Sequence, residues 1–267
     1  MTVSACAKVN LTLEVYGIRP DGYHELRSVV QPVSLADEIM IESAVSGSIM
    51  SDAGYGDDDL IVKAARCLDA AFPSREARGA HFRVMKKIPV GGGLGGGSAD
   101  AAAALRALNV FWDLGASPED LAGIGARVGS DVPALVLAQH YRQPVLMEGR
   151  GERVRLLSRE EWPYPSGTWF VLMNPGVHSS TAEVYRHCRA RMVPATEAVN
   201  DLEPFAVAIH PEIGEALALL REIGAGNVMM SGSGATVFGC APDEPSAGQM
   251  AEELRKRGFF SRSVRTL

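Results

Sequence analysis

Apolar and polar residues alternate over the first fifteen positions of the chain. The apolar residues occupy every second position: Val3, Ala5, Ala7, Val9, Leu11, Leu13 and Val15. A sustained period of two is typical of a strand with one buried face. The alternation therefore predicts a half-buried strand over residues 3–15, with Lys8 and Asn10 on the same non-core face.

Further along the chain, strand and helix patterns follow one another. Strands are predicted near residues 28–34, 38–42, 80–88, 169–173, 227–230 and 235–241. Helices are predicted near residues 60–71, 98–110, 117–128, 181–191, 211–222 and 246–257. Residues 46–59 and 160–167 have loop compositions. The composition of the sequence changes after residue 152, and this change predicts two domains, over residues 1–155 and 156–267.

A run of glycines lies between the strand predicted at 80–88 and the helix predicted at 98–110. Six of the seven residues from 91 to 97 are glycine. Such residues allow backbone N–H groups to approach a ligand closely, and a helix N-terminus favours an anion. Lys86 and Lys87 add positive charge just upstream. We therefore predict a phosphate cradle here, with a flexible linker as the alternative.

The three common phosphate-binding motifs do not fit this run. A dinucleotide-binding fold requires a second parallel strand that ends in an acid, whereas here a loop and another helix start follow. A Walker loop ends in Gly-Lys-Ser/Thr, but this run ends in Gly-Gly-Ser-Ala. The His-Arg-Asp and Asp-Phe-Gly signatures of protein kinases are missing from the sequence. A nucleotide phosphate remains the expected ligand.

Composition narrows the class of protein. The 267 residues carry 26 Lys and Arg against 32 Asp and Glu, and a net charge of −6 argues against a nucleic-acid partner. Four dispersed cysteines fit a reducing cytoplasm better than a disulfide framework or a zinc site. No apolar run of about 18 residues predicts a membrane span, and no secretory signal is recognisable. We expect a cytoplasmic protein with a small-molecule substrate and no membrane partner.

Five motifs, in order along nearly the whole chain, resemble a known superfamily. Pro89–Ala102, PVGGGLGGGSADAA, is similar to the ATP loop of the GHMP kinases, and Met230–Ala235, MSGSGA, is similar to their C-terminal glycine motif. The other three resemble the branch of this superfamily that phosphorylates a cytidine diphosphate-linked methylerythritol. They are AKVNL at 7–11 followed by RPDGYH at 19–24, GSDVP at 129–133, and NPGV at 174–177.

The resemblance implies a fold, a reaction and a catalytic pair. The fold would be α+β, with the active site in a cleft between an N-terminal ATP-binding domain and a ferredoxin-like C-terminal domain. The reaction would transfer the γ-phosphate of ATP, with Mg²⁺, to the 2-hydroxyl of 4-diphosphocytidyl-2-C-methyl-D-erythritol in the non-mevalonate route to isoprenoids. Lys8 and Asp131 would be catalytic, because a carboxylate can accept the hydroxyl proton and a lysine can stabilise the developing alkoxide.

The resemblance also implies binding residues. The ATP loop would comprise Pro89, Gly91, Gly92, Gly93, Leu94, Gly95, Gly96, Gly97, Ser98 and Ala99, with Ser98 also meeting Mg²⁺. The acceptor would contact Asn10, Tyr23, His24, Thr181 and Tyr185: Asn10 near the sugar alcohol, and Tyr23, His24 and Tyr185 around the cytosine. Asp59 stands where the family often has asparagine, which leaves the adenine contact open.

Simpler interpretations stay open for individual residues. Lys8 could be a solvated surface residue, Asp131 a helix cap and residues 231–234 a plain turn. At the level of function, the alternatives are another GHMP kinase, of homoserine or mevalonate type, and a non-catalytic ligand sensor with the same fold. A dehydrogenase is a more distant alternative. The oligomeric state is left open by the sequence.

Overall fold

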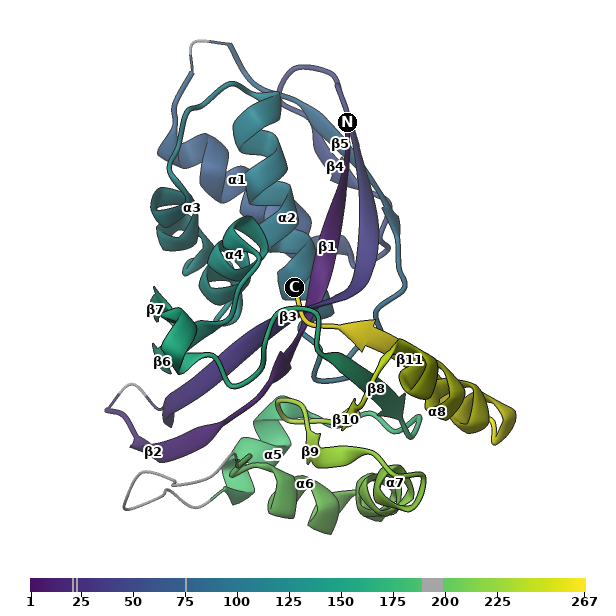
Figure 1. The fold of residues 1–267 in the computed structure, drawn as a ribbon. Helices are drawn as coiled ribbons and strands as arrows, with labels where there is room; N and C mark the ends of the chain where they lie inside the picture. Colours follow the sequence, from purple (N-terminus) through teal and green to yellow (C-terminus); the bar gives the residue numbers. More distant parts are fainter. Residues whose placement is uncertain (21, 23, 75, 189–198) are drawn as a thin grey trace.

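The chain folds around two β-sheets, each packed against helices (Figure 1). The computed structural model describes residues 1–20, 22, 24–74, 76–188 and 199–267. Tyr23, one of the predicted substrate contacts, lies outside the described residues.

The first sheet has seven strands, and β3 (His24–Glu42) is its centre. The other members are β1 (Thr2–Asn10), β2 (Glu14–Ile18), β4 (Ile49–Ser51), β5 (Ala80–Met85), β6 (Val145–Gly149) and β7 (Arg153–Leu156). β1 and β5 pair with the C-terminal half of β3, while β2 and β6 pair with its N-terminal half. The separate strands predicted at 28–34 and 38–42 are thus one strand. It continues through Asp37 because that buried carboxylate accepts bonds from Lys86 and from the backbone of Ile88.

The predicted strand over residues 3–15 is two strands in the structure. The break falls at Leu13, whose backbone N–H donates to the carbonyl of Val199 at 2.7 Å. Leu13 and Val15 also pack into the core of the second sheet. β1 and β2 both pair with β3, and Leu13 between them forms a bridge to Asn200, so the alternation continues although the strand is interrupted.

Four helices pack beside the first sheet: α1 (Leu60–Ala71), α2 (Gly96–Phe111), α3 (Pro118–Gly125) and α4 (Val132–Tyr141). The bounds of α1 agree with the predicted helix. Ser117 caps α3 and forms a capping box with Asp120. α4 was not predicted, because it is buried on nearly every side and so lacks an amphipathic period.

The second sheet has the strand order β11-β8-β10-β9, all antiparallel. Its strands are β8 (Trp169–Asn174), β9 (Gly226–Met230), β10 (Val237–Ala241) and β11 (Phe260–Arg265), and its helices are α5 (Thr181–His187), α6 (Glu203–Ile209), α7 (Pro211–Glu222) and α8 (Glu244–Lys256). This is the ferredoxin-like arrangement. Phe170 and Leu172 pack against the first core, while Val171 and Met173 face the second. The change of sheet falls between Leu156 and Trp169, and the domain boundary at 155/156 stays a prediction.

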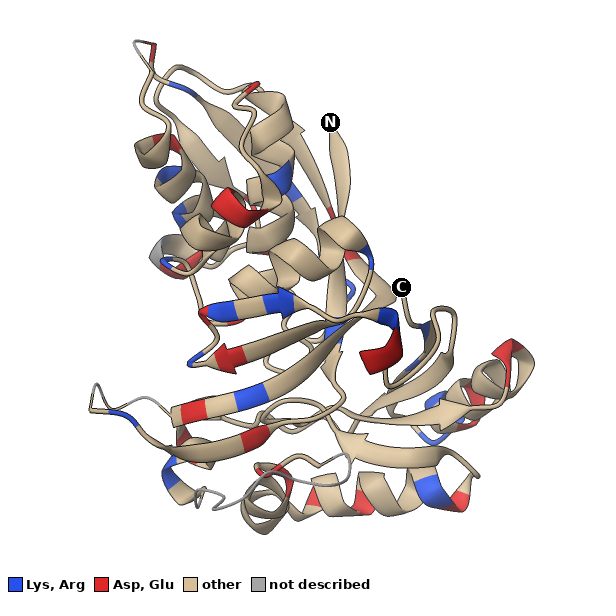
Figure 2. Ribbon diagram, turned by 60° about the vertical axis from the view of Figure 1, so that its left-hand side comes forward, with Lys and Arg blue, Asp and Glu red and all other residues tan. Residues whose placement is uncertain are grey.

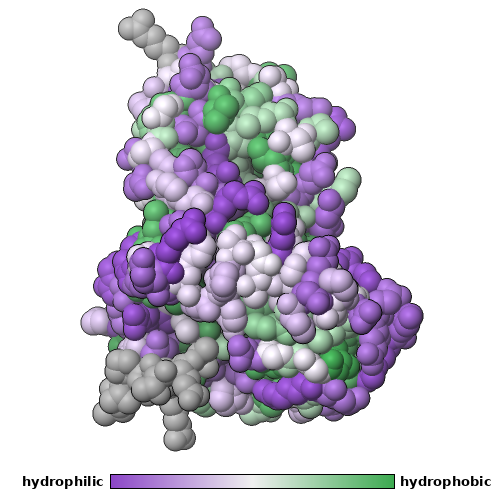
Figure 3. All heavy atoms as spheres, in the orientation of Figure 1, coloured by the Kyte–Doolittle hydropathy of each residue, from purple (hydrophilic) through white to green (hydrophobic). Residues whose placement is uncertain are grey.

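The surface shows no single dominant feature. Acidic and basic residues are interspersed over both halves of the molecule (Figure 2). On the face seen in Figure 3, hydrophobic surface forms small separate areas. Among the described residues, no helix is both long and apolar enough to cross a membrane.

Candidate active site

A cleft of about 850 Å³ lies where segments from both sheets meet. Thirteen of the predicted site residues line it: Lys8, Asn10, His24, Gly91, Gly92, Gly93, Gly95, Gly96, Gly97, Ser98, Asp131, Thr181 and Tyr185. The side chains of Leu94 and Ala99 are instead buried in the core, so these two residues can meet a ligand only through the backbone. Pro89 lines a smaller cavity of about 200 Å³ beside the loop.

The glycine loop leads directly into the N-terminus of α2. Gly95 precedes the helix with a left-handed φ of 68°, and no side chain caps the first turn. Gly96, Gly97 and Ser98 form that turn and line the cleft. A helix start without a capping side chain, opening into a cleft, is suited to an anion because its N–H groups are available and the helix dipole favours negative charge.

The two glycine motifs meet at this loop. Thr236 N–H donates to the carbonyl of Gly92 at 3.1 Å, and the Ser231 hydroxyl donates to the carbonyl of Gly93 at 2.9 Å. A Cβ atom on Gly93 would lie 2.1 Å from the carbonyl oxygen of Ser231. The absence of a side chain at Gly93 is therefore what lets the C-terminal motif approach the glycine loop.

The Lys8 ammonium contacts three polar groups that line the cleft. Its side chain is 4% exposed, so it is not a solvated surface residue. Its Nζ donates to Asn10 Oδ1 at 2.5 Å and to the Gly93 carbonyl at 2.8 Å, and it lies 3.7 Å from Asp131 Oδ2. Burial lowers the pKa of Lys8, and the Asp131 carboxylate opposes that shift.

Asp131 directly precedes α4, but its side chain does not cap the helix. Its side chain accepts no hydrogen bond from the helix backbone and is 34% exposed at the cleft. The carboxylate is therefore open to a substrate hydroxyl on one side and near the Lys8 ammonium on the other. The interpretation of Asp131 as a helix cap is wrong for this structure.

On the acceptor side, two aromatic rings are in contact. The centroids of His24 and Tyr185 are 4.9 Å apart, with a tilt of 43°. His24 Nε2 is buried without a hydrogen-bond partner among the described residues, and burial lowers the pKa of its imidazole. A neutral imidazole with an unused edge can bond a polar ligand group. Thr181 contacts the Ser233 hydroxyl at 2.8 Å.

The acids and lysines around the loop are largely engaged with one another. Lys86 Nζ lies 2.5 Å from Asp37 Oδ2 and 2.6 Å from Asp100 Oδ2, and Lys87 lies 3.6 Å from Glu38. Neither lysine therefore supplies the free positive charge that the sequence suggested. Asp59 caps α1, with Oδ1 accepting from Ile61 N–H at 2.8 Å.

Several residues that line the cleft were not predicted: Ser130, Arg150, His178, Arg186 and Ser233. Ser130 and Ser233 lie within recognised motifs, His178 lies next to one, and Arg186 follows the predicted contact Tyr185. His178 follows NPGV directly, and its Nδ1 would be 2.7 Å from a Cβ on Gly91. Arg150 lies between two glycines with positive φ, which indicates a constrained turn. For Ser130, His178 and Ser233 the available signal was the motif, and for Arg150 it was the pair of flanking glycines.

Two family models match the chain. The model of the GHMP kinase N-terminal domain matches residues 59–139, and that of the GHMP kinase C-terminal domain matches residues 190–259. A homoserine kinase from Cytophaga hutchinsonii shares the fold with a TM-score of 0.75 at 16% identity, covering 100% of this chain and 94% of that one. Together with the ATP loop and the cleft, these matches place the chain in the GHMP kinases, which use ATP as phosphate donor.

Relatives with higher sequence identity define a narrower family within the GHMP kinases. A 4-diphosphocytidyl-2-C-methyl-D-erythritol kinase of Citrifermentans bemidjiense is 41% identical, over 98% of each chain. A crystal structure of 4-(cytidine 5'-diphospho)-2C-methyl-D-erythritol kinase matches with a TM-score of 0.84 at 32% identity, over 100% of this chain and 99% of that one. The chain belongs to the 4-diphosphocytidyl-2-C-methyl-D-erythritol kinase family. The predicted α+β GHMP kinase fold and phosphotransferase class are confirmed.

Proposed function

We propose that the protein transfers the γ-phosphate of ATP to the 2-hydroxyl of 4-diphosphocytidyl-2-C-methyl-D-erythritol. The observation that carries the proposal is the meeting of Lys8, Asp131 and the glycine loop in one cleft, with the Lys8 ammonium 2.8 Å from the loop carbonyl of Gly93 and 3.7 Å from Asp131. The family to which the chain belongs supports the choice of acceptor.

In the proposed reaction, Asp131 is the general base. The acceptor hydroxyl gives its proton to the Asp131 carboxylate while its oxygen bonds to the γ-phosphorus, and the bond from phosphorus to the ADP oxygen breaks. The Lys8 ammonium has three donors, which match Asn10 Oδ1, the Gly93 carbonyl and the Asp131 carboxylate. Its positive charge can therefore orient the Asp131 carboxylate before transfer and stabilise the charge that develops on the acceptor oxygen.

The ATP phosphates would lie on the first turn of α2, where Gly96, Gly97 and Ser98 line the cleft. Mg²⁺ would neutralise phosphate charge when bound. The described residues contain no cluster of three or more His, Cys, Asp and Glu side chains that could hold a metal ion. One protein hydroxyl together with phosphate oxygens and water still fits Mg²⁺, which seldom uses an all-protein cage. Ser98 is the residue we assign to it.

The cytidine end of the acceptor would lie near His24 and Tyr185. The unused Nε2 of His24 suits a hydrogen bond to the cytosine edge, and the Tyr185 ring offers an aromatic face. Thr181 and Asn10 supply polar contacts further along the cleft. Tyr23 keeps its predicted role beside the cytosine as part of this proposal.

The test is ADP release from purified protein with ATP and Mg²⁺, using the cytidyl substrate, homoserine and mevalonate in parallel. The Asp131→Asn variant, purified in the same way, measures background ATP hydrolysis. We expect turnover above this background with the cytidyl substrate alone. Turnover of homoserine or mevalonate, without turnover of the cytidyl substrate, would overturn the assignment.

A further inference from the structure

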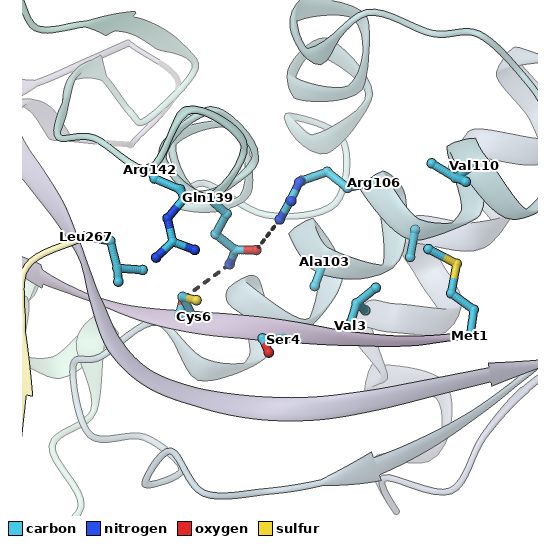
Figure 4. A pocket seen from close by; sticks show the side chains of 11 residues that line it. Met1, Val3, Ser4, Cys6, Ala103, Arg106, Val110, Gln139, Arg142 and Leu267 are labelled. Atoms are coloured by element: carbon cyan, nitrogen blue, oxygen red, sulfur yellow. Dashed lines mark hydrogen bonds between the residues drawn. The ribbon is translucent and has the colours of Figure 1, made fainter.

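A second cavity lies along the C-terminal half of α2, whereas the active-site cleft lies at the first turn of that helix. Its volume is about 290 Å³, and it is bounded by β1, α2, α4 and the last residue of the chain (Figure 4). The residues that line it are Met1, Val3, Ser4, Cys6, Ala103, Arg106, Ala107, Val110, Gln139, Arg142 and Leu267. We call it the back cavity. It shares no lining residue with the cleft.

The polar side of the back cavity is positively charged. The guanidinium groups of Arg106 and Arg142 approach Cys6 and Gln139 from opposite sides (Figure 4). No Asp or Glu side chain lines the cavity. Both arginines are close enough to the Cys6 thiol to oppose the rise in its pKa that burial causes.

Arg106 uses little of its hydrogen-bonding capacity. A guanidinium has five N–H donors, and among the described residues the Arg106 side chain donates one bond, from Nη1 to Gln139 Oε1 at 3.1 Å. Its Nε is buried without a partner. Burial also lowers the pKa of Arg106, and the nearby Cys6 side chain opposes that shift. A partly buried cation with a buried, unpartnered donor is less favourable than one that is paired with an anion.

Gln139 cannot supply the missing acceptors. Its side chain is 5% exposed. Its amide NH₂ donates to the carbonyls of Cys6 at 3.2 Å and Ala99 at 3.4 Å, while its oxygen accepts from Arg106. The amide therefore ties β1, α2 and α4 together and holds the Arg106 guanidinium at the cavity. The carbonyl oxygen of Leu267 accepts a bond from Gln31 Nε2 at 3.4 Å.

The opposite wall of the cavity is apolar. Val3, Ala103 and Ala107 form it, and Met1 and Val110 stand at an exposed rim. We propose that the back cavity is a binding site for a small oxyanion, a carboxylate or a phosphate, that carries a short apolar chain. The two guanidiniums would hold the oxyanion through charge-assisted hydrogen bonds, and the chain would lie along the alanine and valine side chains.

The test is titration calorimetry on the full chain with four probes: n-butyl phosphate, pentanoate, inorganic phosphate and 1-pentanol. A saturating non-hydrolysable ATP analogue with Mg²⁺ fills the cleft, so that anion binding there is excluded. We expect butyl phosphate or pentanoate to bind at one site with a Kd below about 1 mM, and at least about tenfold more tightly than 1-pentanol. The tighter of the two anions identifies the headgroup.

Variants locate the site. Arg142→Gln changes an exposed side chain, so it leaves the packing intact, and we expect it to weaken binding by about tenfold. Arg106→Gln is expected to weaken binding at least as much. Arg83→Gln, an exposed arginine paired with Glu42 on β3, changes the net charge equally and is expected to leave binding unchanged. Equal affinities in all three variants, equal binding of 1-pentanol, or no binding of either amphipathic anion would overturn the proposal.

Discussion

Gly93 is the position where one methyl group is expected to separate the two glycine motifs. In Gly93→Ala, the new Cβ would lie 2.1 Å from the Ser231 carbonyl oxygen and 2.9 Å from that of Gly234. Both neighbours are backbone atoms, so no side chain can rotate away. The residue also has φ +75°, a conformation that costs an alanine about 1–2 kcal/mol. The contact between the loops therefore has to open.

The expected loss of stability follows from the close contact of the new Cβ and from the backbone strain. Overpacking against backbone costs about 1–3 kcal/mol, so with the backbone strain the free energy of unfolding is expected to fall by about 2–5 kcal/mol. For a chain of this size that corresponds to a fall in Tm of roughly 5–15 °C. Turnover is expected to fall by about 100-fold, because the Gly93 carbonyl positions Lys8 and a displacement of about 1 Å has that effect on catalysis.

Thermal denaturation and ADP release measure the two effects separately. Gly123→Ala is the matched control, because Gly123 lies within α3, has no atom within 4 Å of an added Cβ and has no positive φ. It is expected to raise stability by about 0.5–1 kcal/mol and to leave turnover unchanged. A Gly93→Ala variant with the Tm and turnover of this control would refute the reasoning from close approach.

Three further variants test separate features. Asp131→Asn is expected to lower kcat by about 10²–10⁴-fold with an unchanged Kd for ATP in calorimetry, because the glycine loop is separate from the base; near-normal turnover would exclude a base at this position. Asp59→Ala removes the cap of α1 and is expected to cost about 1 kcal/mol in thermal denaturation, whereas Asp59→Asn keeps the cap; equal Tm values for the two variants would contradict this role. Burial raises the pKa of Asp100 to about 7, against opposition from Lys86. The folded chain then retains a proton that the unfolded chain releases above about pH 4, so stability falls as the pH rises toward 7. Asp100→Asn is expected to remove that dependence of Tm on pH, and parallel curves would show that Asp100 does not titrate there.

The elements that sequence reasoning predicted best are those with one buried face. α1 and α7 have the predicted bounds, Leu60–Ala71 and Pro211–Glu222, because their apolar residues recur at helical spacing. α4 has buried residues all round, so its pattern carries no period. The long strand β3 was divided because Asp37 interrupts the apolar pattern, and its partner Lys86 lies 49 residues away. Periodicity reports local burial and contains no information about such a distant ion pair.

The candidate site, like the fold, could be predicted only in part from the sequence. Alternation alone placed Lys8 and Asn10 on one face, and the structure joins them at 2.5 Å. That this face is buried depends on the C-terminal motif, since Asn10 N–H donates to the Ser231 hydroxyl across 221 residues. Family resemblance pointed to Asp131 and Thr181, whereas His178 had only its place directly after NPGV and Arg150 only its two flanking glycines. Residues whose roles depend on long-range docking were therefore the hardest to assign.

The geometry of Lys8 depends on both halves of the molecule at once. The carbonyl oxygen of Gly93 has two lone pairs, and it accepts one bond from Lys8 and another from the Ser231 hydroxyl. A buried ammonium needs all its acceptors in place, because an unpaired charge at 4% exposure is strongly unfavourable. Asn10 comes from the first sheet, Gly93 from the loop before α2, and Ser231 from the loop that follows β9 of the second sheet. The lysine can therefore be held beside Asp131 only when the two sheets are docked, so their contact belongs to the geometry of the proposed catalytic pair as well as to the core.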